Sequence, residues 1–310
     1  MNIVIIGQQD FGQAVLEEFL ERGDQVLAVF CAPQKEGAKP DVLKVAAEER
    51  LIPVYQYPNL RDPEVISLME NLAPDLGVMA YVLQFVPDVL LQIPKFGTIQ
   101  YHPSLLPKYR GPSSINWPII QGDTKTGLTI FRPTDGLDEG PVLLQKEVII
   151  GPDDTLGSVY FDYLFPLGVQ AMLEAADGVV SGKLKGIVQD EQQAGYEGWC
   201  RKAESMIYWA RHVDQVYNLI RGCNPAPGAW TTLNGQSVYF FDSKKHPCQT
   251  FSSVRNKIGH VSEINESSIK VVAQGGEIEV FKVRGESGKK ISAAEWGRQV
   301  GLTVGQLLGN

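Results

Sequence analysis

The first part of the chain alternates short apolar runs with segments whose apolar residues recur at helical spacing. Asn2–Ile6 and Gln25–Cys31 are apolar runs of strand length, and Phe11–Glu21 between them has a helical pattern. Such a repeat predicts parallel strands joined by crossover helices, and hence an α/β fold with a doubly wound, mostly parallel sheet. Further helices are predicted over Val42–Glu49, Pro63–Asn71 and Thr155–Ala176, and further strands over Pro53–Gln56, Leu76–Ala80, Thr98–His102, Gly127–Phe131 and Val142–Ile150.

The pattern changes after about residue 187. Gln189–Tyr196 is polar and typical of a loop, and most of the remaining chain consists of short apolar runs between turn residues. We therefore expect two domains, a larger α/β domain over residues 1–205 and a small C-terminal β-barrel over residues 206–310. Within the second domain the sequence predicts helices near Asp214–Arg221 and Ala293–Val300, and strands over Ser237–Phe241, Ser268–Ala273 and Glu277–Val283.

The charge balance narrows the classes of partner. The 310 residues include 28 Lys and Arg against 36 Asp and Glu, a formal net charge of −8, which disfavours a general polyanion binder or a membrane anchor. Residues 1–205 hold 16 basic and 28 acidic side chains (−12), whereas residues 206–310 hold 12 and 8 (+4). No apolar stretch has the length of a membrane span, and no basic residue precedes Arg22, so the sequence predicts a cytoplasmic protein without a signal peptide.

The cysteines suggest neither a disulfide framework nor a zinc site. They are few and far apart in the sequence, and no two of them form a C-x-x-C pair, so we expect reduced thiols and no metal. These residues are Cys31, Cys200, Cys223 and Cys248.

Two loops carry candidate chemistry. Ligands of open α/β sheets bind beyond the carboxyl ends of the strands. His102 ends a predicted strand, and Pro103 and Pro107 prevent a helix from following it, so a rigid loop should hold the imidazole. Gly136–Gly140 is a glycine-punctuated acidic loop that carries Asp138. A His and an Asp from neighbouring strand ends can cooperate in proton transfer, although each alone also fits a structural histidine or a plain Asp-Gly turn.

Taken together, these loops resemble those of the folate-dependent formyltransferase superfamily. His102–Pro107 reads His-Pro-Ser-Leu-Leu-Pro, and Gly136–Gly140 reads Gly-Leu-Asp-Glu-Gly. Within the superfamily, the chain is most similar to the N-terminal hydrolase domain of the 10-formyltetrahydrofolate dehydrogenases. The similarity extends through Val4–Gln8, Ser114–Trp117, Leu143–Glu147, Leu164–Pro166, Tyr196–Gly198 and Pro227–Trp230.

This resemblance implies a substrate and a set of roles. The substrate would be 10-formyltetrahydrofolate, whose formyl group passes to water or to an amine. His102 corresponds to the catalytic histidine of the family, which stabilises charge on the formyl oxygen, and Asp138 to the aspartate that activates the nucleophile. The folate-binding segments correspond to Tyr81–Pro87 (with Tyr81, Val82, Leu83, Gln84 and Phe85) and to Thr134–Asp138 (with Thr134, Asp135, Gly136 and Leu137).

Gln100 departs from the family pattern. The transferases have Asn two residues before the histidine, and the dehydrogenase hydrolase domain has an aliphatic residue there. Gln100 keeps an amide but is one methylene longer, so it would either donate to the same oxyanion from a displaced position or shape a different acceptor pocket. Residues 100 and 102 share one strand face, which disfavours a merely solvent-facing Gln100. Pro141, where the family commonly has Asp, is a second departure.

Three functions remain in competition. We favour a hydrolase that releases formate from 10-formyltetrahydrofolate, either alone or as the front part of a protein with downstream carrier and aldehyde dehydrogenase modules. The alternative is an N-formyltransferase acting on methionyl-tRNA, an amino sugar or another amine. A tRNA acceptor is disfavoured because Ala32–Pro40 is short and only mildly basic, although the +4 second domain could compensate. A non-catalytic folate-binding module would not need both His102 and Asp138.

The sequence offers no site for a nicotinamide cofactor. Gly7 and Gly12 follow the first predicted strand, but they lack the G-x-G-x-x-G spacing, and no catalytic cysteine segment is present. Oxidation of the formyl group with NADP is therefore not assigned to this chain. The remaining histidines, His212, His246 and His260, lack the spacing of metal ligands, and we expect surface or structural roles for them.

Overall fold

A computed structural model describes residues 1–310 except 249, 251, 253, 287 and 310. Its contacts divide the chain into two compact units. The boundary between residues 205 and 206 stays a prediction, and the units are described below as the packing defines them. The first unit comprises Met1–Gly111, Gly127–Val148 and Tyr163–Tyr196, and the second comprises Pro112–Thr126, Ile149–Asp162 and Glu197–Asn310.

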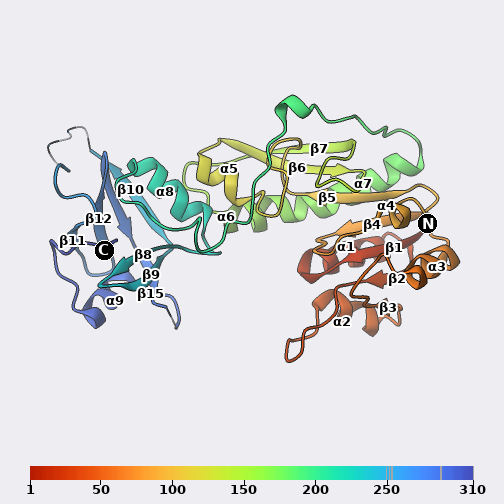
Figure 1. Cartoon of the computed structure of the whole chain (residues 1–310), viewed down its shortest axis with the longest axis horizontal. Helices are drawn as coiled ribbons and strands as arrows, with labels where there is room; N and C mark the ends of the chain where they lie inside the picture. The colour runs from red at the N-terminus through yellow and green to blue at the C-terminus, as the bar shows by residue number, and fades with distance from the viewer. Residues whose placement is uncertain (249, 251, 253, 287, 310) are drawn as a thin grey trace. The chain divides into compact units, whose positions relative to one another are not determined.

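The first unit is built on a twisted, mostly parallel sheet (Figure 1). Within the described residues its strand order is β3-β2-β1-β4-β5-β6-β7, with β1 pairing in parallel with both β2 and β4. β6 runs antiparallel to β5. The predicted doubly wound α/β fold is confirmed. The strands are β1 (Asn2–Gly7), β2 (Gln25–Phe30), β3 (Val54–Tyr55), β4 (Leu76–Ala80), β5 (Thr98–His102), β6 (Lys125–Phe131) and β7 (Val142–Ile149).

Helices cover both faces of this sheet because its central strands are apolar on both sides. Val4 and Ile6 of β1 belong to a buried cluster that includes residues of α3 and α4. On the other face, Phe11 of α1 stacks on Tyr101 of β5, with ring centroids 4.3 Å apart. Burial on both faces explains why these strands read as continuous apolar runs. The helices are α1 (Gln9–Glu21), α2 (Val42–Glu49), α3 (Pro63–Leu72), α4 (Asp88–Leu91) and α7 (Phe165–Val180).

The carboxyl ends of β1 and β4 approach each other closely. A Cβ atom on Gly7 would lie 2.2 Å from the carbonyl oxygen of Ala80, so only glycine fits at the end of β1. The strand order reverses between β1 and β4, which is where open α/β sheets place their ligand crevice. His102 ends the next strand, β5, at the same edge of the sheet.

The long helix predicted over Thr155–Ala176 is confirmed as helical from Leu156 onward, but it is not one regular α-helix. Thr155 caps a short helix, α6 (Leu156–Ser158), a π-helical turn follows over Val159–Leu164, and α7 begins at Phe165. Pro166 supplies a physical reason, because its ring lacks an N–H and would clash with the carbonyl of the residue four positions earlier. The apolar period predicts the helix but not the π-helical turn within it.

The second unit contains two antiparallel sheets, each with four strands in the described part of the chain. Their orders are β10-β13-β12-β11 and β15-β14-β9-β8. The single strand predicted over Glu277–Val283 is two strands, because the chain passes from one sheet to the other at Phe281. The elements are α5 (Asn116–Gln121), α8 (Val213–Gly222), β8 (Ala229–Leu233), β9 (Gln236–Phe240), β10 (Ser243–Pro247), β11 (Val261–Ile264), β12 (Ile269–Ala273), β13 (Gly276–Val280), β14 (Lys282–Arg284), β15 (Ile291–Ser292) and α9 (Ala293–Val300).

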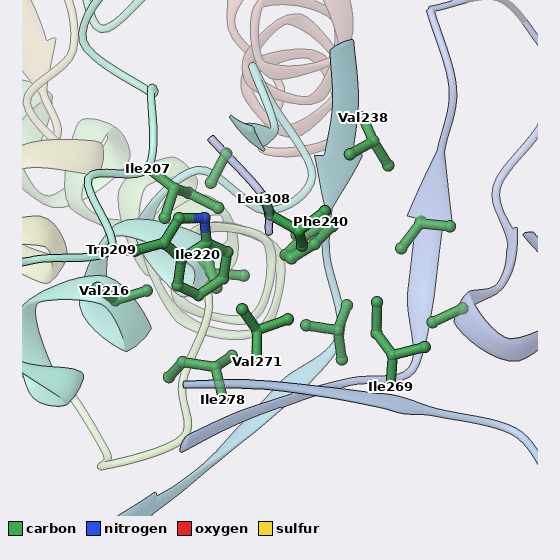
Figure 2. Close-up of a cluster of buried hydrophobic side chains, with 14 of the residues drawn as sticks. Ile207, Trp209, Val216, Ile220, Val238, Phe240, Ile269, Val271, Ile278 and Leu308 are labelled. Atoms are coloured by element: carbon green, nitrogen blue, oxygen red, sulfur yellow. The ribbon is translucent and has the colours of Figure 1, made fainter. Parts of the chain in front are cut away.

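Both sheets contribute to one apolar core. Figure 2 shows Phe240 of β9 and Ile278 of β13 in the same cluster as Trp209 and Ile220, and each of these side chains is buried. Cys200 and Cys223 also belong to this cluster, as free thiols with their sulfur atoms 3.8 Å apart. The second unit therefore has its own core, as a small β domain requires.

No helix within the described residues is long and apolar enough to cross a membrane.

Truncating Ile278 should expose how tightly this core is packed. Ile278 is fully buried, so we expect Ile278→Ala to lower the free energy of unfolding by about 2 to 5 kcal/mol, and Ile278→Val by about 0.5 to 1.5 kcal/mol. Urea denaturation followed by circular dichroism measures both values. Val304→Ala, at a position 61% exposed, is the control and should shift stability by less than about 0.5 kcal/mol. Equal losses for Ile278→Ala and Val304→Ala would contradict the packing described.

Candidate active site

His102 is buried at the carboxyl end of β5, with 5% of its surface exposed. Its Nε2 lies 2.9 Å from the carbonyl oxygen of Tyr109. Because a carbonyl oxygen only accepts hydrogen bonds, we assign the hydrogen of the neutral ring to Nε2. The other nitrogen, Nδ1, then faces Asp138, whose Oδ2 is 3.6 Å away. This separation is longer than a hydrogen bond, so the imidazole and the carboxylate are neighbours that are not directly bonded to each other.

The histidine loop, residues 102–111, is held by side chains of the neighbouring strands. Thr129 of β6 donates its hydroxyl to the carbonyl of Ser104 (2.7 Å) and accepts from the backbone N–H of Leu106 (3.1 Å). Gln145 of β7 donates to the carbonyl of Leu106 (2.8 Å) and to the hydroxyl of Thr129 (2.9 Å). The loop is thus fixed by tertiary hydrogen bonds as well as by its two prolines.

Asp138 is also buried, with 8% of its surface exposed. Its backbone has a φ of +56°, in the left-handed region that few residues other than glycine adopt. Its Oδ2 accepts a hydrogen bond from the backbone N–H of Gly111 (2.9 Å), so the histidine loop itself orients the carboxylate. The acidic loop, residues 134–140, is tight at its end, because a Cβ atom on Gly140 would lie 1.6 Å from the carbonyl oxygen of Arg132.

Gln189 connects the acidic loop to the polar segment Gln189–Tyr196, whose sequence indicates only a domain boundary. Its Nε2 donates to the carbonyl oxygens of both Asp138 (2.8 Å) and Gly140 (2.7 Å). Its Oε1 accepts from Nε and Nη2 of Arg110, at 3.2 and 2.8 Å. Sequence reasoning missed this contact because Gln189 lies 51 residues from Asp138 and belongs to no element with a period. Arg110 lies three residues after the end of the His102–Pro107 motif, but this spacing gives no indication of Gln189.

Arg110 is fully buried, and all of its donors have partners within the described residues. Besides its bonds to Gln189, it donates to both carboxylate oxygens of Glu191 (2.7 and 3.0 Å) and to the hydroxyl of Tyr196 (2.7 Å). The hydrogen bonds to Glu191 are the main cause that raises the pKa of Arg110, and they lower the pKa of Glu191. A buried cation is tolerated only when it is paired in this way.

The two segments that the resemblance assigns to folate binding present exposed apolar side chains. Tyr81, Leu83 and Phe85 alternate outward directly after β4, and Leu137 of the acidic loop is 56% exposed. Between them, Val82 and Gln84 are half-buried. Exposed apolar groups of this size are typical of a binding surface.

A hydrogen bond joins the second segment to the residue that follows the first. The Oδ1 of Asp135 accepts from the backbone N–H of Asp88 at the start of α4 (3.0 Å). Nearby, Thr134 accepts from the N–H of Gly136 (3.3 Å), which shapes the turn before Leu137. Parts of the chain about fifty residues apart in the sequence are therefore joined beside Leu137.

Gln100 lies opposite Met79 of β4 and Phe131 of β6. It is half-buried, and its amide group makes no hydrogen bond to any described residue. Because side chains alternate along a strand, Gln100 and His102 share one face of β5.

No group of three or more His, Cys, Asp or Glu side chains that could hold a metal ion occurs among the residues that the structure describes.

Comparison with known protein families decides the class of this fold. A family described as formyl transferase matches residues 1–175, and the formyl transferase C-terminal domain matches residues 200–301. The first match alone covers more than half of the 310 residues.

The chain belongs to the formyl transferase family.

Its relatives within the formyl transferase family include two kinds of protein. Mitochondrial 10-formyltetrahydrofolate dehydrogenase of Mus musculus is 41% identical over 248 residues, which are 78% of this chain and 27% of that protein. The cytosolic dehydrogenase of Xenopus tropicalis is 42% identical with the same coverage. Methionyl-tRNA formyltransferase of Syntrophus aciditrophicus (strain SB) is 33% identical over 314 residues, 100% of this chain and 99% of that protein. The chain thus spans about a quarter of the length of the dehydrogenases that it matches.

Solved structures share the fold of this member of the formyl transferase family at low sequence identity. HypX from Aquifex aeolicus, in complex with tetrahydrofolic acid, has a TM-score of 0.68 and 17% identity, over 95% of this chain and 46% of that one. The sugar 3N-formyl transferase WlaRD, in the presence of dTDP and 5-N-formyl-THF, has a TM-score of 0.66 and 18% identity, over 93% and 99%. At this identity the likeness establishes the fold only.

The Arg110–Glu191 pair predicts a pH dependence of stability. A carboxyl whose pKa is lower in the folded than in the unfolded chain stabilises the fold above its unfolded pKa, and this contribution is lost as the pH falls through the folded pKa. We therefore expect Glu191→Gln to destabilise the protein most at pH values above the ordinary pKa of glutamate, and the difference to shrink in more acidic solution. Denaturant unfolding of both proteins across this range measures it. A difference that grows on acidification would contradict the assignment.

Proposed function

We propose that this formyl transferase family member is a 10-formyltetrahydrofolate hydrolase that releases formate and tetrahydrofolate. The observation that carries the proposal is the burial of His102 and Asp138 side by side at the carboxyl end of β5, with Nδ1 and Oδ2 3.6 Å apart. The identity of 41–42% to 10-formyltetrahydrofolate dehydrogenases over 248 residues supports the choice of substrate.

The chemistry that this pair would perform is acyl transfer to water. Asp138 accepts a proton from water as the oxygen attacks the formyl carbon, and the C=O electron pair moves onto the formyl oxygen. His102 keeps its Nε2 hydrogen on the carbonyl oxygen of Tyr109, so it donates to this oxyanion in the imidazolium form, through a second proton taken up from solvent at Nδ1 before the attack and retained there throughout. As the oxyanion reforms its double bond, the bond from carbon to N10 breaks, and N10 takes the proton held by Asp138. The products are formic acid, which ionises to formate, and tetrahydrofolate.

Gln100 and the exposed apolar residues complete the proposed site. The amide of Gln100, which has no partner among the described residues, would donate to the same oxyanion from its displaced position. Tyr81–Pro87 and Thr134–Asp138 would receive the pterin, with Tyr81, Leu83, Phe85 and Leu137 as its apolar contacts. The tetrahydrofolic acid bound to HypX, which has the same fold, supports a folate ligand.

Formyl transfer to an amine is the second candidate. The similarity to a methionyl-tRNA formyltransferase over the whole of both chains favours it, and the acceptor would be methionyl-tRNA, an amino sugar or another amine. The mildly basic segment Ala32–Pro40 offers little phosphate neutralisation, which disfavours a tRNA. If the chain instead acts as the front part of a longer dehydrogenase, as its 27% coverage of those relatives allows, carrier and aldehyde dehydrogenase modules would be its partners.

Incubation with 10-formyltetrahydrofolate separates these candidates. We expect purified protein to release formate in the absence of any amine, with thiol added, and mass spectrometry detects both formate and formylated amines. Formylation of a supplied amine without formate release in its absence would replace the hydrolase by the transferase. Absence of both products would refute the catalytic proposal.

Removing either acid–base group should nearly abolish turnover. We expect His102→Ala and Asp138→Ala each to lower kcat by at least about 100-fold, the usual contribution of a positioned acid–base or oxyanion group. Formate release under saturating substrate measures this, and thermal unfolding checks that both variants fold. Lys108→Ala, at an exposed position of the same loop, serves as the control. Near-normal turnover in either site variant would contradict the assigned mechanism.

A further inference from the structure

We propose that Gln189, anchored by Arg110, is the positioning residue that holds Asp138 against His102. This inference rests on the proposed function, because it assigns Gln189 a role in the same site. Gln189 belongs to neither motif of the family resemblance, and it follows α7 in the sequence, in a part of the first unit without regular structure. Its side chain is nevertheless buried, with 7% of its surface exposed.

The amide of Gln189 uses both of its ends. The NH₂ group donates to the carbonyl oxygens on either side of Glu139, those of Asp138 and Gly140. The amide oxygen accepts two hydrogen bonds from the Arg110 guanidinium. A buried amide with all of these partners has one orientation available, so it acts as a fixed bracket for the acidic loop.

These bonds close a ring around Asp138. Arg110 holds Gln189, Gln189 holds the backbone carbonyl of Asp138, and the N–H of Gly111, the next residue after Arg110, holds the carboxylate of Asp138. Both the main chain and the side chain of Asp138 are therefore fixed from the dipeptide at residues 110–111. The same loop carries His102 at its start, so one set of contacts sets the separation between the two catalytic groups.

Asp138 needs such an external hold. Its φ of +56° is sparsely populated by residues with a side chain, and a backbone in this region persists only where surrounding contacts determine it. Without the two donors from Gln189, the carbonyls of Asp138 and Gly140 would lose their buried partners and the loop would relax. A misplacement of a reacting group by about 1 Å can cost about 100-fold in rate.

Gln189→Glu tests the role with a nearly isosteric change. The introduced carboxylate still accepts from Arg110 but gives no N–H to the two carbonyls. We expect kcat for formyl release to fall by about 10- to 100-fold, as for other supporting residues of reactive groups, while KM changes by less than about twofold. Gln192→Glu is the matched control, because it makes the same charge change on an exposed residue of the same segment and should leave kcat unaltered.

Measuring Gln189→Glu in a protein that already carries Asp138→Asn distinguishes a role in positioning Asp138 from a general effect on the protein. If Gln189 acts through Asp138, then Gln189→Glu should lower kcat much less when Asp138→Asn is already present than it does in the wild type. Additive losses would overturn the proposal. So would equal kcat in Gln189→Glu and Gln192→Glu, an effect on KM alone, or a Gln189→Glu protein that fails to fold while Gln192→Glu folds.

Crystal structures of the two variants give a readout that does not depend on activity. We expect the distance from His102 Nδ1 to Asp138 Oδ2 to change in Gln189→Glu and to match the wild type in Gln192→Glu. An unchanged separation in both would overturn the positioning role. Wild-type protein that neither releases formate nor formylates an amine would instead refute the proposed function, so the two failures are distinguishable.

Discussion

A fully buried guanidinium is the constraint around which this site is organised. A cation removed from water is costly unless each N–H finds an acceptor. Arg110 meets that requirement through residues distant in the sequence, because it donates to Gln189, Glu191 and Tyr196. Gln189 in turn donates to the acidic loop at the carbonyl oxygen of Asp138. The need to satisfy one charge thus brings together the two loops whose motifs mark the formyl transferase family.

Much of the fold was predictable from the sequence, because a helix or strand that is buried on one or both faces has apolar residues at a characteristic spacing. The strand at Thr98–His102 and the helices at Val42–Glu49 and Ala293–Val300 were predicted with the observed bounds. The helix over Thr155–Ala176 was predicted, but its π-helical turn before Pro166 was not, because that turn does not disturb the apolar period. The strand over Glu277–Val283 failed because a change of sheet leaves the alternation of residues intact.

The candidate site was predictable only in part. The sequence predicted that His102 and Asp138 would cooperate as residues from neighbouring strand ends, and the structure places them together. The strand-end rule does not explain this contact, because β6, which precedes Asp138, runs antiparallel to β5. The loop after β6 brings Asp138 to His102. Their supports, Thr129, Gln145 and Gln189, could not be inferred, because a buried polar side chain finds its partner through tertiary packing and carries no local signal. The local sequence pattern therefore identifies the two proposed acid–base residues, but it does not identify the residues that hold them in place.

The hydrogen bond from His102 to the carbonyl oxygen of Tyr109 limits how the imidazole can transfer protons. With Nε2 committed to a backbone oxygen, the imidazole cannot take a proton at one nitrogen and deliver another from the opposite side, as a shuttling histidine does. A proton that enters at Nδ1 must also leave at Nδ1. The ring can therefore exchange a proton only at Nδ1, on the side of Asp138, and it cannot relay a proton through Nε2.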